Sequence, residues 1–140
     1  MMYHRDMRAV TLADAYELSK LEYELFEEHL SKEAIREEIR AGYGWLIEDK
    51  EDLKAYILVR DDRYILDITR FGTRTAYQGE GLGTRLLAQV LRTPRAVMLT
   101  VDAENVVALR MYLKNGFKVV GQLPHDSGWV LRRDARICAR

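Results

Sequence analysis

A glycine-rich heptapeptide, Gln78-Gly79-Glu80-Gly81-Leu82-Gly83-Thr84, most constrains how this chain can fold. It follows a strand-like run that ends near Thr73 and precedes a helix-like run from Arg85 to Leu91. Glycines let successive backbone amides converge, and the start of a helix carries partial positive charge. The segment therefore predicts an anion-binding loop at a helix N-terminus, suited to a pyrophosphate. A flexible turn without a ligand is the alternative interpretation.

Other glycine loops fit this segment less well. The dinucleotide fingerprint G-x-G-x-x-G/A would place Thr84 where its third glycine or alanine belongs. The Gly-Lys-Ser/Thr of a Walker loop does not occur in the sequence. The spacing of Gly79, Gly81 and Gly83 also resembles the loop of S-adenosylmethionine methyltransferases. Too little chain follows Gly83 for the larger sheet of those enzymes, so this stays a minor alternative.

A second segment, from Leu99 to Phe117, combines a strand, Asn105, a helix that carries Tyr112, and Gly116. Asn105 and Tyr112 are seven residues apart, close to two helical turns, so both side chains face the same way. The pair can therefore address one ligand. Each residue also has a purely structural interpretation, Asn105 as a helix N-cap and Tyr112 as a core tyrosine.

The two segments together resemble the GNAT superfamily of acyl-CoA N-acyltransferases. Gln78, Gly81 and Gly83 match the Q/R-x-x-G-x-G/A signature of that superfamily, and the segment from Leu99 to Phe117 is similar to its later motif. The motifs occur in the family's order, and the resemblance covers roughly residues 7–134. It implies an enzyme, an acetyl-CoA-dependent N-acetyltransferase with acetyl-CoA as co-substrate.

Hydrophobic periodicity and turn residues predict an α/β (α+β) chain with the order βααβββαβαββ. Thr11 and Asp14 form a capping box at the start of the first helix. The resemblance implies the GNAT fold, a mixed central sheet of about seven strands flanked by about four helices. The expected strands are 7–10, 43–48, 53–60, 63–73, 96–101, 117–123 and 128–132, and the expected helices are 11–29, a second after Ser31, 85–92 and one beginning near 105.

The resemblance also implies how the cofactor binds. The strand ending near Phe71 to Thr73 would splay from the strand near Leu99 and admit the pantetheine arm between them. Backbone groups of Phe71 and Thr73 would bond that arm, loop amides would hold the pyrophosphate, and the Thr84 hydroxyl would add a donor. Arg74, Arg85 and Arg110 are candidates for the ribose phosphate. The cofactor-binding residues expected in this way are Phe71, Thr73, Gln78, Gly79, Glu80, Gly81, Leu82, Gly83, Thr84 and Asn105.

The implied chemistry is direct attack of a neutral amine on the acetyl thioester in a ternary complex. Tyr112 is the candidate acid, because a phenol stays protonated at neutral pH and can donate to the leaving thiolate. An amide near Phe71 would stabilise the oxyanion. One GNAT subgroup has a glutamate base twelve residues before its tyrosine, where this chain has Thr100. Histone-type relatives have one eleven residues before the loop glutamine, which makes Asp67 the candidate base here, or else a structural aspartate.

Composition limits which class of protein this chain can belong to. The 140 residues, 48% hydrophobic and 31% charged, fit a single domain covering 1–140. Equal numbers of basic and acidic residues argue against nucleic-acid binding, and no apolar run approaches the ~20 residues that span a membrane. Cys138 is the only cysteine and His4, His29 and His125 are dispersed, so no disulfide and no metal are expected. A cytoplasmic protein is expected, and a homodimer is left open.

The acceptor is less constrained than the cofactor. Residues 17–38 contain eight glutamates and three cations, which would attract a cationic amine, although two solvated helix faces explain the pattern equally. The turn from Pro124 to Trp129 lacks the tyrosine common in acetyltransferases of peptide N-termini. The sequence therefore favours a small cationic amine. The alternatives are a protein or peptide amine, N-terminal or lysine, and a non-catalytic acyl-CoA-binding module.

Overall fold

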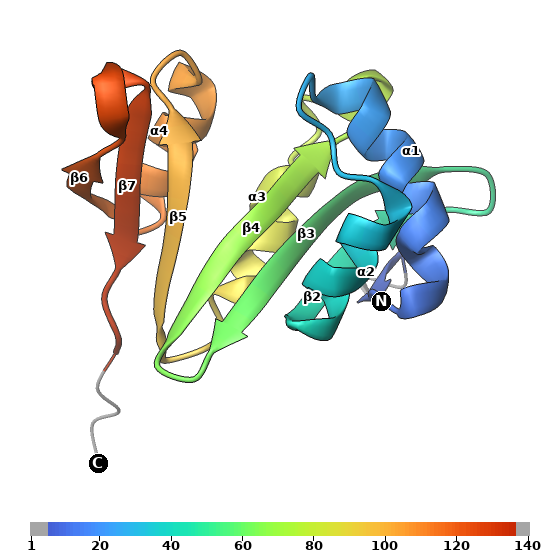
Figure 1. The fold of residues 1–140 in the computed structure, drawn as a ribbon, viewed down its shortest axis with the longest axis horizontal. Coiled ribbons are helices and arrows are strands. Elements are labelled where there is room, and N and C mark those ends of the chain that lie inside the picture. The colour runs from blue at the N-terminus through green and yellow to red at the C-terminus, as the bar shows by residue number, and fades with distance from the viewer. Residues whose placement is uncertain (1–5, 137–140) are drawn as a thin grey trace.

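Seven strands and four α-helices follow one another in the order βααβββαβαββ in the computed structural model, which describes residues 6–136 (Figure 1). Three short 3-10 turns, η1 (Leu12–Asp14), η2 (Thr75–Tyr77) and η3 (Pro124–Asp126), join them. The strands are β1 (Met7–Ala9), β2 (Gly42–Glu48), β3 (Leu53–Asp62), β4 (Ile65–Thr73), β5 (Ala96–Asp102), β6 (Lys118–Gln122) and β7 (Gly128–Arg133). The helices are α1 (Ala15–Leu25), α2 (Lys32–Arg40), α3 (Leu82–Val90) and α4 (Val106–Lys114).

The sheet has the strand order β1-β2-β3-β4-β5-β7-β6, and only β4 and β5 are parallel. Strands β2, β3 and β4 form the antiparallel meander that three aliphatic and aromatic runs between charged turns predict. Pairing between β4 and β5 is confined to Ile65–Asp67 and Ala96–Met98. Beyond those residues the two strands diverge, as Figure 1 shows, so the sheet is open as a V on one side.

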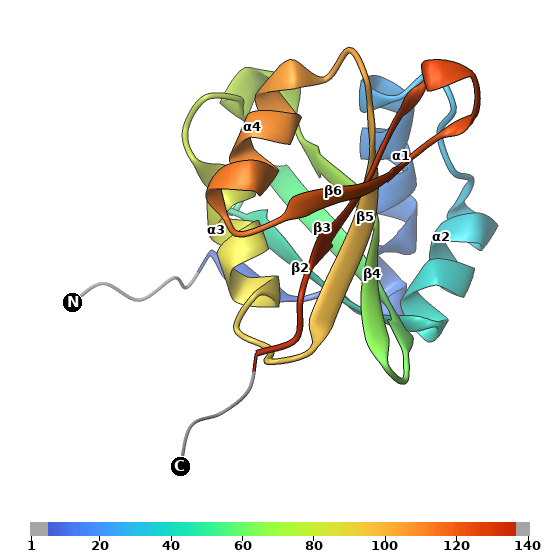
Figure 2. The same ribbon diagram turned by 90° about the vertical axis from the view of Figure 1, so that its left-hand side faces the viewer.

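Helices cover both faces of the sheet (Figure 2). The face under α3 and α4 contains a large core cluster that includes Leu86, Val97 and Leu131, all without exposed surface. The opposite face packs Leu18 and Ile35 of α1 and α2 on Leu58 of β3. The first cluster also holds Leu66 and Ile68 of β4 and Leu99 and Val101 of β5, so both strands beside the opening are anchored in the core.

The predicted fold class and element order are confirmed, and most boundaries agree within three residues. Thr11 donates its amide to the Asp14 carboxylate at 2.7 Å, one half of the predicted capping box. The first helix, however, ends at Leu25 and not near His29, because Phe26 adopts an extended conformation. The amide of Leu30 bonds to the Glu22 side chain at 3.0 Å, so a tertiary contact turns the chain there.

Several expectations fall on residues 1–5 and 137–140, which lie outside the described residues: the beginning of the chain, His4 and Cys138. Within 6–136, none of the helices has the length and apolar character needed to cross a bilayer. In that same range, no three His, Cys, Asp or Glu side chains gather closely enough to hold a metal ion.

Candidate active site

A cavity of about 570 Å³, here called the loop cleft, lies between the end of β4, the glycine loop and α4. Gln78, Gly79, Gly81, Gly83 and Thr84 all line it from the loop side. The cleft therefore brings together the two segments that the sequence singled out. Phe71, Gly72 and Thr73 line it from β4, and Asn105, Val107, Ala108, Met111 and Tyr112 line it from the beginning and face of α4.

The glycine loop has the geometry of an anion-binding site. Gly79 and Gly81 have φ values of 86° and 82°, and a Cβ at either position would meet no atom within 4 Å. The loop is thus open on the side where a ligand would approach, and Gly81 is the N-cap of α3. The first amides of a helix have no partner inside it, so they are available to an anion.

Two of the predicted cofactor-binding residues contribute no side chain to the cleft. Glu80 and Leu82 are absent from its lining, and Leu82 is 7% exposed within the core under α3. Only their backbone amides can serve a pyrophosphate. Gln78 donates its side-chain amide to the Thr73 carbonyl at 3.0 Å and so ties the loop to the end of β4. The roles of all ten residues as cofactor ligands stay predictions.

Replacing Gly81 by alanine should weaken coenzyme A binding about tenfold. A side chain at a φ of 82° costs about 1–2 kcal/mol, which the loop relieves by moving its amides away from the anion. Isothermal titration with coenzyme A measures the dissociation constant. Gly121→Ala is the matched control, because a Cβ there makes an ordinary contact with Val130 at 3.6 Å. Equal affinities of the two variants would contradict the interpretation of the loop as an anion-binding site.

Tyr112 and Asn105 lie together as their spacing predicts. Asn105 caps α4, and its side chain accepts a hydrogen bond from the Ala108 amide at 3.2 Å. Tyr112 is 7% exposed and packs against the rings of Phe71 and Phe117. Burial raises the pKa of its phenol to about 12. No other described side chain bonds the Tyr112 hydroxyl, so its proton is available to a ligand.

The candidates for the ribose phosphate differ in their surroundings. Arg74 pairs with Glu24 at 2.6 Å, and Arg85 pairs with Asp6 at 2.8 Å. Both guanidinium groups are therefore already engaged with carboxylates of the chain. Arg110 lies exposed on α4, is absent from the lining of the loop cleft, and stays a candidate.

A second cavity of about 660 Å³, here called the strand groove, lies between β4, β5 and the segment that joins α1 to α2. Phe26, Phe71, Asn105 and Tyr112 line both cavities. The strand groove and the loop cleft therefore meet at the Tyr112 ring. This arrangement lets two ligands approach one point from two different cavities, as a transfer reaction between two substrates requires.

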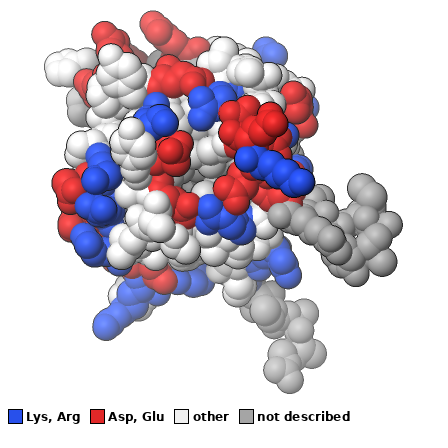
Figure 3. Space-filling model, turned by 90° about the vertical axis from the view of Figure 1, so that its right-hand side faces the viewer, with Lys and Arg blue, Asp and Glu red and all other residues white. Residues whose placement is uncertain are grey.

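The charge of the strand groove comes from a few residues of the acidic segment. Six of the eight glutamates in residues 17–38 are paired with cations. Basic and acidic side chains accordingly alternate over the α1 and α2 face (Figure 3). Glu27 and Glu28 line the groove together with Asp102. Among the described residues none of these three has an ion pair, whereas the positive charge of Arg70 is balanced by Glu22. The groove is therefore negative.

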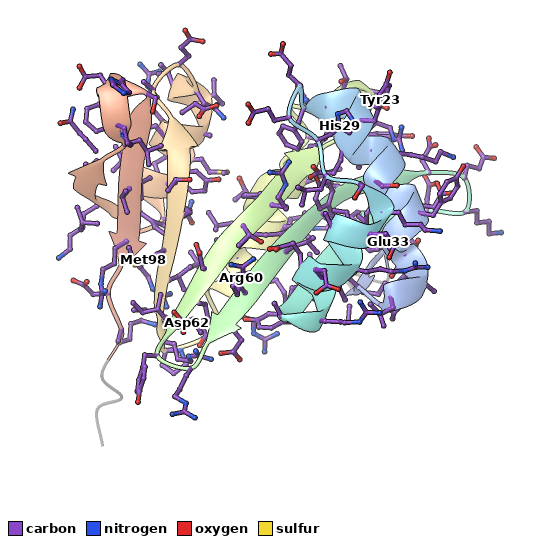
Figure 4. All side chains as sticks on the ribbon, in the orientation of Figure 1. Tyr23, His29, Glu33, Arg60, Asp62 and Met98 are labelled. Carbon is purple, nitrogen blue, oxygen red and sulfur yellow. The ribbon has the colours of Figure 1, made fainter. Side chains whose placement is uncertain are left out.

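Asp67 is not brought to either cavity. It lines neither the loop cleft nor the strand groove, and its register partners are Arg60 on β3 and Met98 on β5. Figure 4 labels Arg60 and Met98 near the closed end of the V. Burial raises the pKa of the Asp67 carboxyl, against the opposing effect of Arg60. Its role as a base stays a prediction.

Replacing Asp67 by asparagine should raise the melting temperature at pH 7. A carboxyl whose folded pKa is raised binds protons more tightly in the folded state, so its contribution to stability falls as pH rises above its unfolded pKa of 3.8. The gain of the variant should therefore disappear below about pH 4. Calorimetry at pH 3.5 and pH 7 measures it, and an unchanged melting temperature at pH 7 would contradict the expectation.

The sequence did not identify three residues of the strand groove. Phe26 and Arg70 belong to no motif, and the guanidinium of Arg70 lies over the Phe26 ring at 5.0 Å. Asp102 could have been found from strand periodicity. It lies two residues after Thr100, so on a strand both side chains point to the same face.

The comparisons with known proteins agree with the fold. The family model for the acetyltransferase (GNAT) domain matches residues 12–131. The chain is 29% identical to N-alpha-acetyltransferase RimI of Mycobacterium tuberculosis (strain ATCC 25618 / H37Rv), over 91% of this chain and 90% of that protein. The chain belongs to the GNAT family, and as a member it is an acetyl-CoA-dependent N-acetyltransferase.

Solved structures show the same fold. The crystal structure of the ribosomal-protein-S18-alanine N-acetyltransferase from Escherichia coli has a TM-score of 0.82 at 14% identity, covering 95% of each chain. Arabidopsis thaliana Naa50, in complex with the bisubstrate analogue CoA-Ac-MVNAL, has a TM-score of 0.78 at 20% identity, over 92% of this chain and 99% of that one. At these identities the likeness concerns the fold alone.

Proposed function

We propose that this protein transfers the acetyl group of acetyl-CoA to the α-amino group of a polypeptide N-terminus. The observation that carries the proposal is the shape of the strand groove. The Phe26–Glu28 segment walls it on one side, while no residue of the β6–β7 turn lines it. An acceptor chain can therefore leave the groove past that turn. The names of RimI, the S18-alanine enzyme and the Naa50 complex support a peptide acceptor.

The residues of the loop cleft fit acetyl-CoA. The open glycine loop suits a pyrophosphate, and the edge of β4 beyond Asp67 has no β5 partner, which leaves backbone groups for the pantetheine arm. When bound, acetyl-CoA supplies an acyl thioester, the activated group of the reaction. The Phe71 and Thr73 backbone would align that arm, and an amide near Phe71 would stabilise negative charge on the acyl oxygen.

Tyr112 would complete the reaction. The amine nitrogen attacks the acyl carbon from the strand groove, and the carbon–sulfur bond breaks toward the loop cleft. The phenol of Tyr112 lies where the two cavities meet and donates its proton to the departing sulfur. A pKa of about 12 keeps that phenol protonated at neutral pH.

A small cationic amine is the second candidate acceptor, as the sequence favoured. The specific observation for it is the negative strand groove, where Glu27, Glu28 and Asp102 lack ion pairs among the described residues. A diamine would place one ammonium near these carboxylates and present the other for acetylation. A polypeptide N-terminus places a single ammonium there.

Thermal unfolding with acetyl-CoA and coenzyme A tests the first step, because a ligand at about 100 times its dissociation constant adds ~2.7 kcal/mol of stability. An acetyl-transfer assay then compares three acceptors: a free-N-terminal peptide, the same peptide blocked at the N-terminus but containing lysine, and a diamine. We expect transfer to the first. Transfer only to the diamine would favour the second candidate, and stabilisation without transfer to any amine would indicate a non-catalytic acyl-CoA-binding module.

A further inference from the structure

Strand β5 presents the carboxylate of Asp102, its last residue, to the strand groove. Val97, Leu99 and Val101 point into the core under α3 and α4, so Met98, Thr100 and Asp102 point to the opposite face. Thr100 and Asp102 both line the strand groove, as Tyr112 does. Thr100 offers only a hydroxyl, a weak proton acceptor, whereas Asp102 offers a carboxylate.

The surroundings of Asp102 leave its carboxylate open to a ligand. Its partner on β7 is Gly128, and a Cβ at that position would meet the Val101 carbonyl oxygen at 2.2 Å. A side chain is therefore excluded there, and none from that position covers Asp102. Among the described residues, no cation pairs with Asp102 and no donor bonds its side chain. The residue itself is exposed.

The backbone of Asp102 is firmly held. It closes the β5–β7 ladder, and its carbonyl accepts the Asn105 amide at 3.0 Å. Glu27 and Glu28, the other carboxylates of the groove, lie in the segment between α1 and α2. A group that must meet a reacting atom is better placed on a strand than on a loop.

We infer that Asp102 is the base that takes the proton from the ammonium of the acceptor. The inference rests on the proposed function. The proton passes from the acceptor nitrogen to the Asp102 carboxylate, directly or through one water, and then to solvent. The freed nitrogen lone pair forms the bond to the acyl carbon, the carbon–sulfur bond breaks, and the sulfur takes the Tyr112 proton. As the amide forms, the nitrogen loses a second proton to solvent, and solvent returns one to Tyr112, so the net release is one proton for each acetyl group transferred.

Geometry favours Asp102 over Asp67. Met98, the register partner of Asp67, is four residues before Asp102, which is about 13 Å along a strand. Asp67 is thus near the closed end of the V, while Asp102 is at the open end with Tyr112. The groove's other ionisable groups are Glu27, Glu28, Arg70 and Tyr112. Arg70 is held by Glu22, and Tyr112 serves as the acid.

The test is Asp102→Asn, assayed across pH 5–10 with the acceptor that the wild type uses. We expect kcat to fall about 100-fold or more, while KM for the acceptor changes much less. The stabilisation by acetyl-CoA should be unchanged, because Asp102 does not line the loop cleft. Thr100→Glu in the Asp102→Asn background should recover part of kcat, because it returns a carboxylate to the same face of β5.

Glu104→Gln is the matched control, since it also removes one exposed carboxylate near Asp102 and lines neither cavity, and it should keep kcat within about threefold. The inference is overturned if Asp102→Asn keeps kcat and raises only KM, or if Asp67→Asn instead lowers kcat about 100-fold. If the wild type acetylates diamines and no peptide, the proposed acceptor is wrong, while the Asp102 result still stands or falls with the diamine. A wild type that acetylates no amine overturns both.

Discussion

Tyr112→Phe is expected to lower kcat about 100- to 1,000-fold while the affinity for coenzyme A stays nearly the same. Phenylalanine keeps the ring contacts with Phe71 and Phe117 and removes only the hydroxyl. That hydroxyl has no other described side chain to bond, so its loss leaves no buried partner unsatisfied. Steady-state kinetics with acetyl-CoA and titration with coenzyme A measure the two quantities.

Tyr77→Phe provides the control for this variant. Tyr77 donates its hydroxyl to Asp52 at 2.5 Å, away from the two cavities, so its loss should leave kcat unchanged. The wild-type kcat should also show no descending limb from Tyr112 below about pH 11, because an acid with a pKa of about 12 loses its proton only above that range. Nearly full activity of Tyr112→Phe would rule out an acid role.

Local patterns in the sequence predict much of the fold and of the loop cleft. The glycine loop and the Asn105–Tyr112 spacing each depend on residues close in sequence, where backbone geometry decides which side chains share a face. The strands of the meander follow from runs rich in aliphatic and aromatic residues that charged turns separate. The structure places these residues as predicted because no distant contact overrides the local preference.

The strand groove depends on distant contacts that no local pattern reveals. Glu22 and Arg70 are 48 residues apart, and as sequence positions they look like a surface glutamate and a strand arginine. Their contact ends α1 early and shapes the segment that walls the groove. The place of Asp67 also depends on strand pairing, and its role as a base stays a prediction. Its spacing from the loop glutamine suggests a base, but the register of β4 keeps it near the closed end of the V.

Arg70→Met is expected to destabilise the protein by about 3–5 kcal/mol, because it leaves a buried carboxylate without its cation. Glu22 has no exposed surface and bonds Arg70 at 2.5 and 2.9 Å, and it also accepts from the Tyr56 hydroxyl. Urea unfolding measures the change. Arg36→Met is the control: it breaks an exposed pair with Glu33 and should cost less than about 1 kcal/mol.

The double variant Glu22→Met/Arg70→Met separates two effects of this pair: that of its buried charge on stability, and that of its hydrogen bonds on the segment that walls the strand groove. Removing both partners leaves no buried charge, so it should recover most of the stability that Arg70→Met loses. It should not recover acceptor binding. The Leu30 amide bonds Glu22, and Arg70 bonds the Glu28 carbonyl at 3.3 Å, so the segment that walls the strand groove loses two of its anchors. We therefore expect near-normal stability with a raised KM for the acceptor, and an unchanged KM would show that the segment holds its shape without the pair.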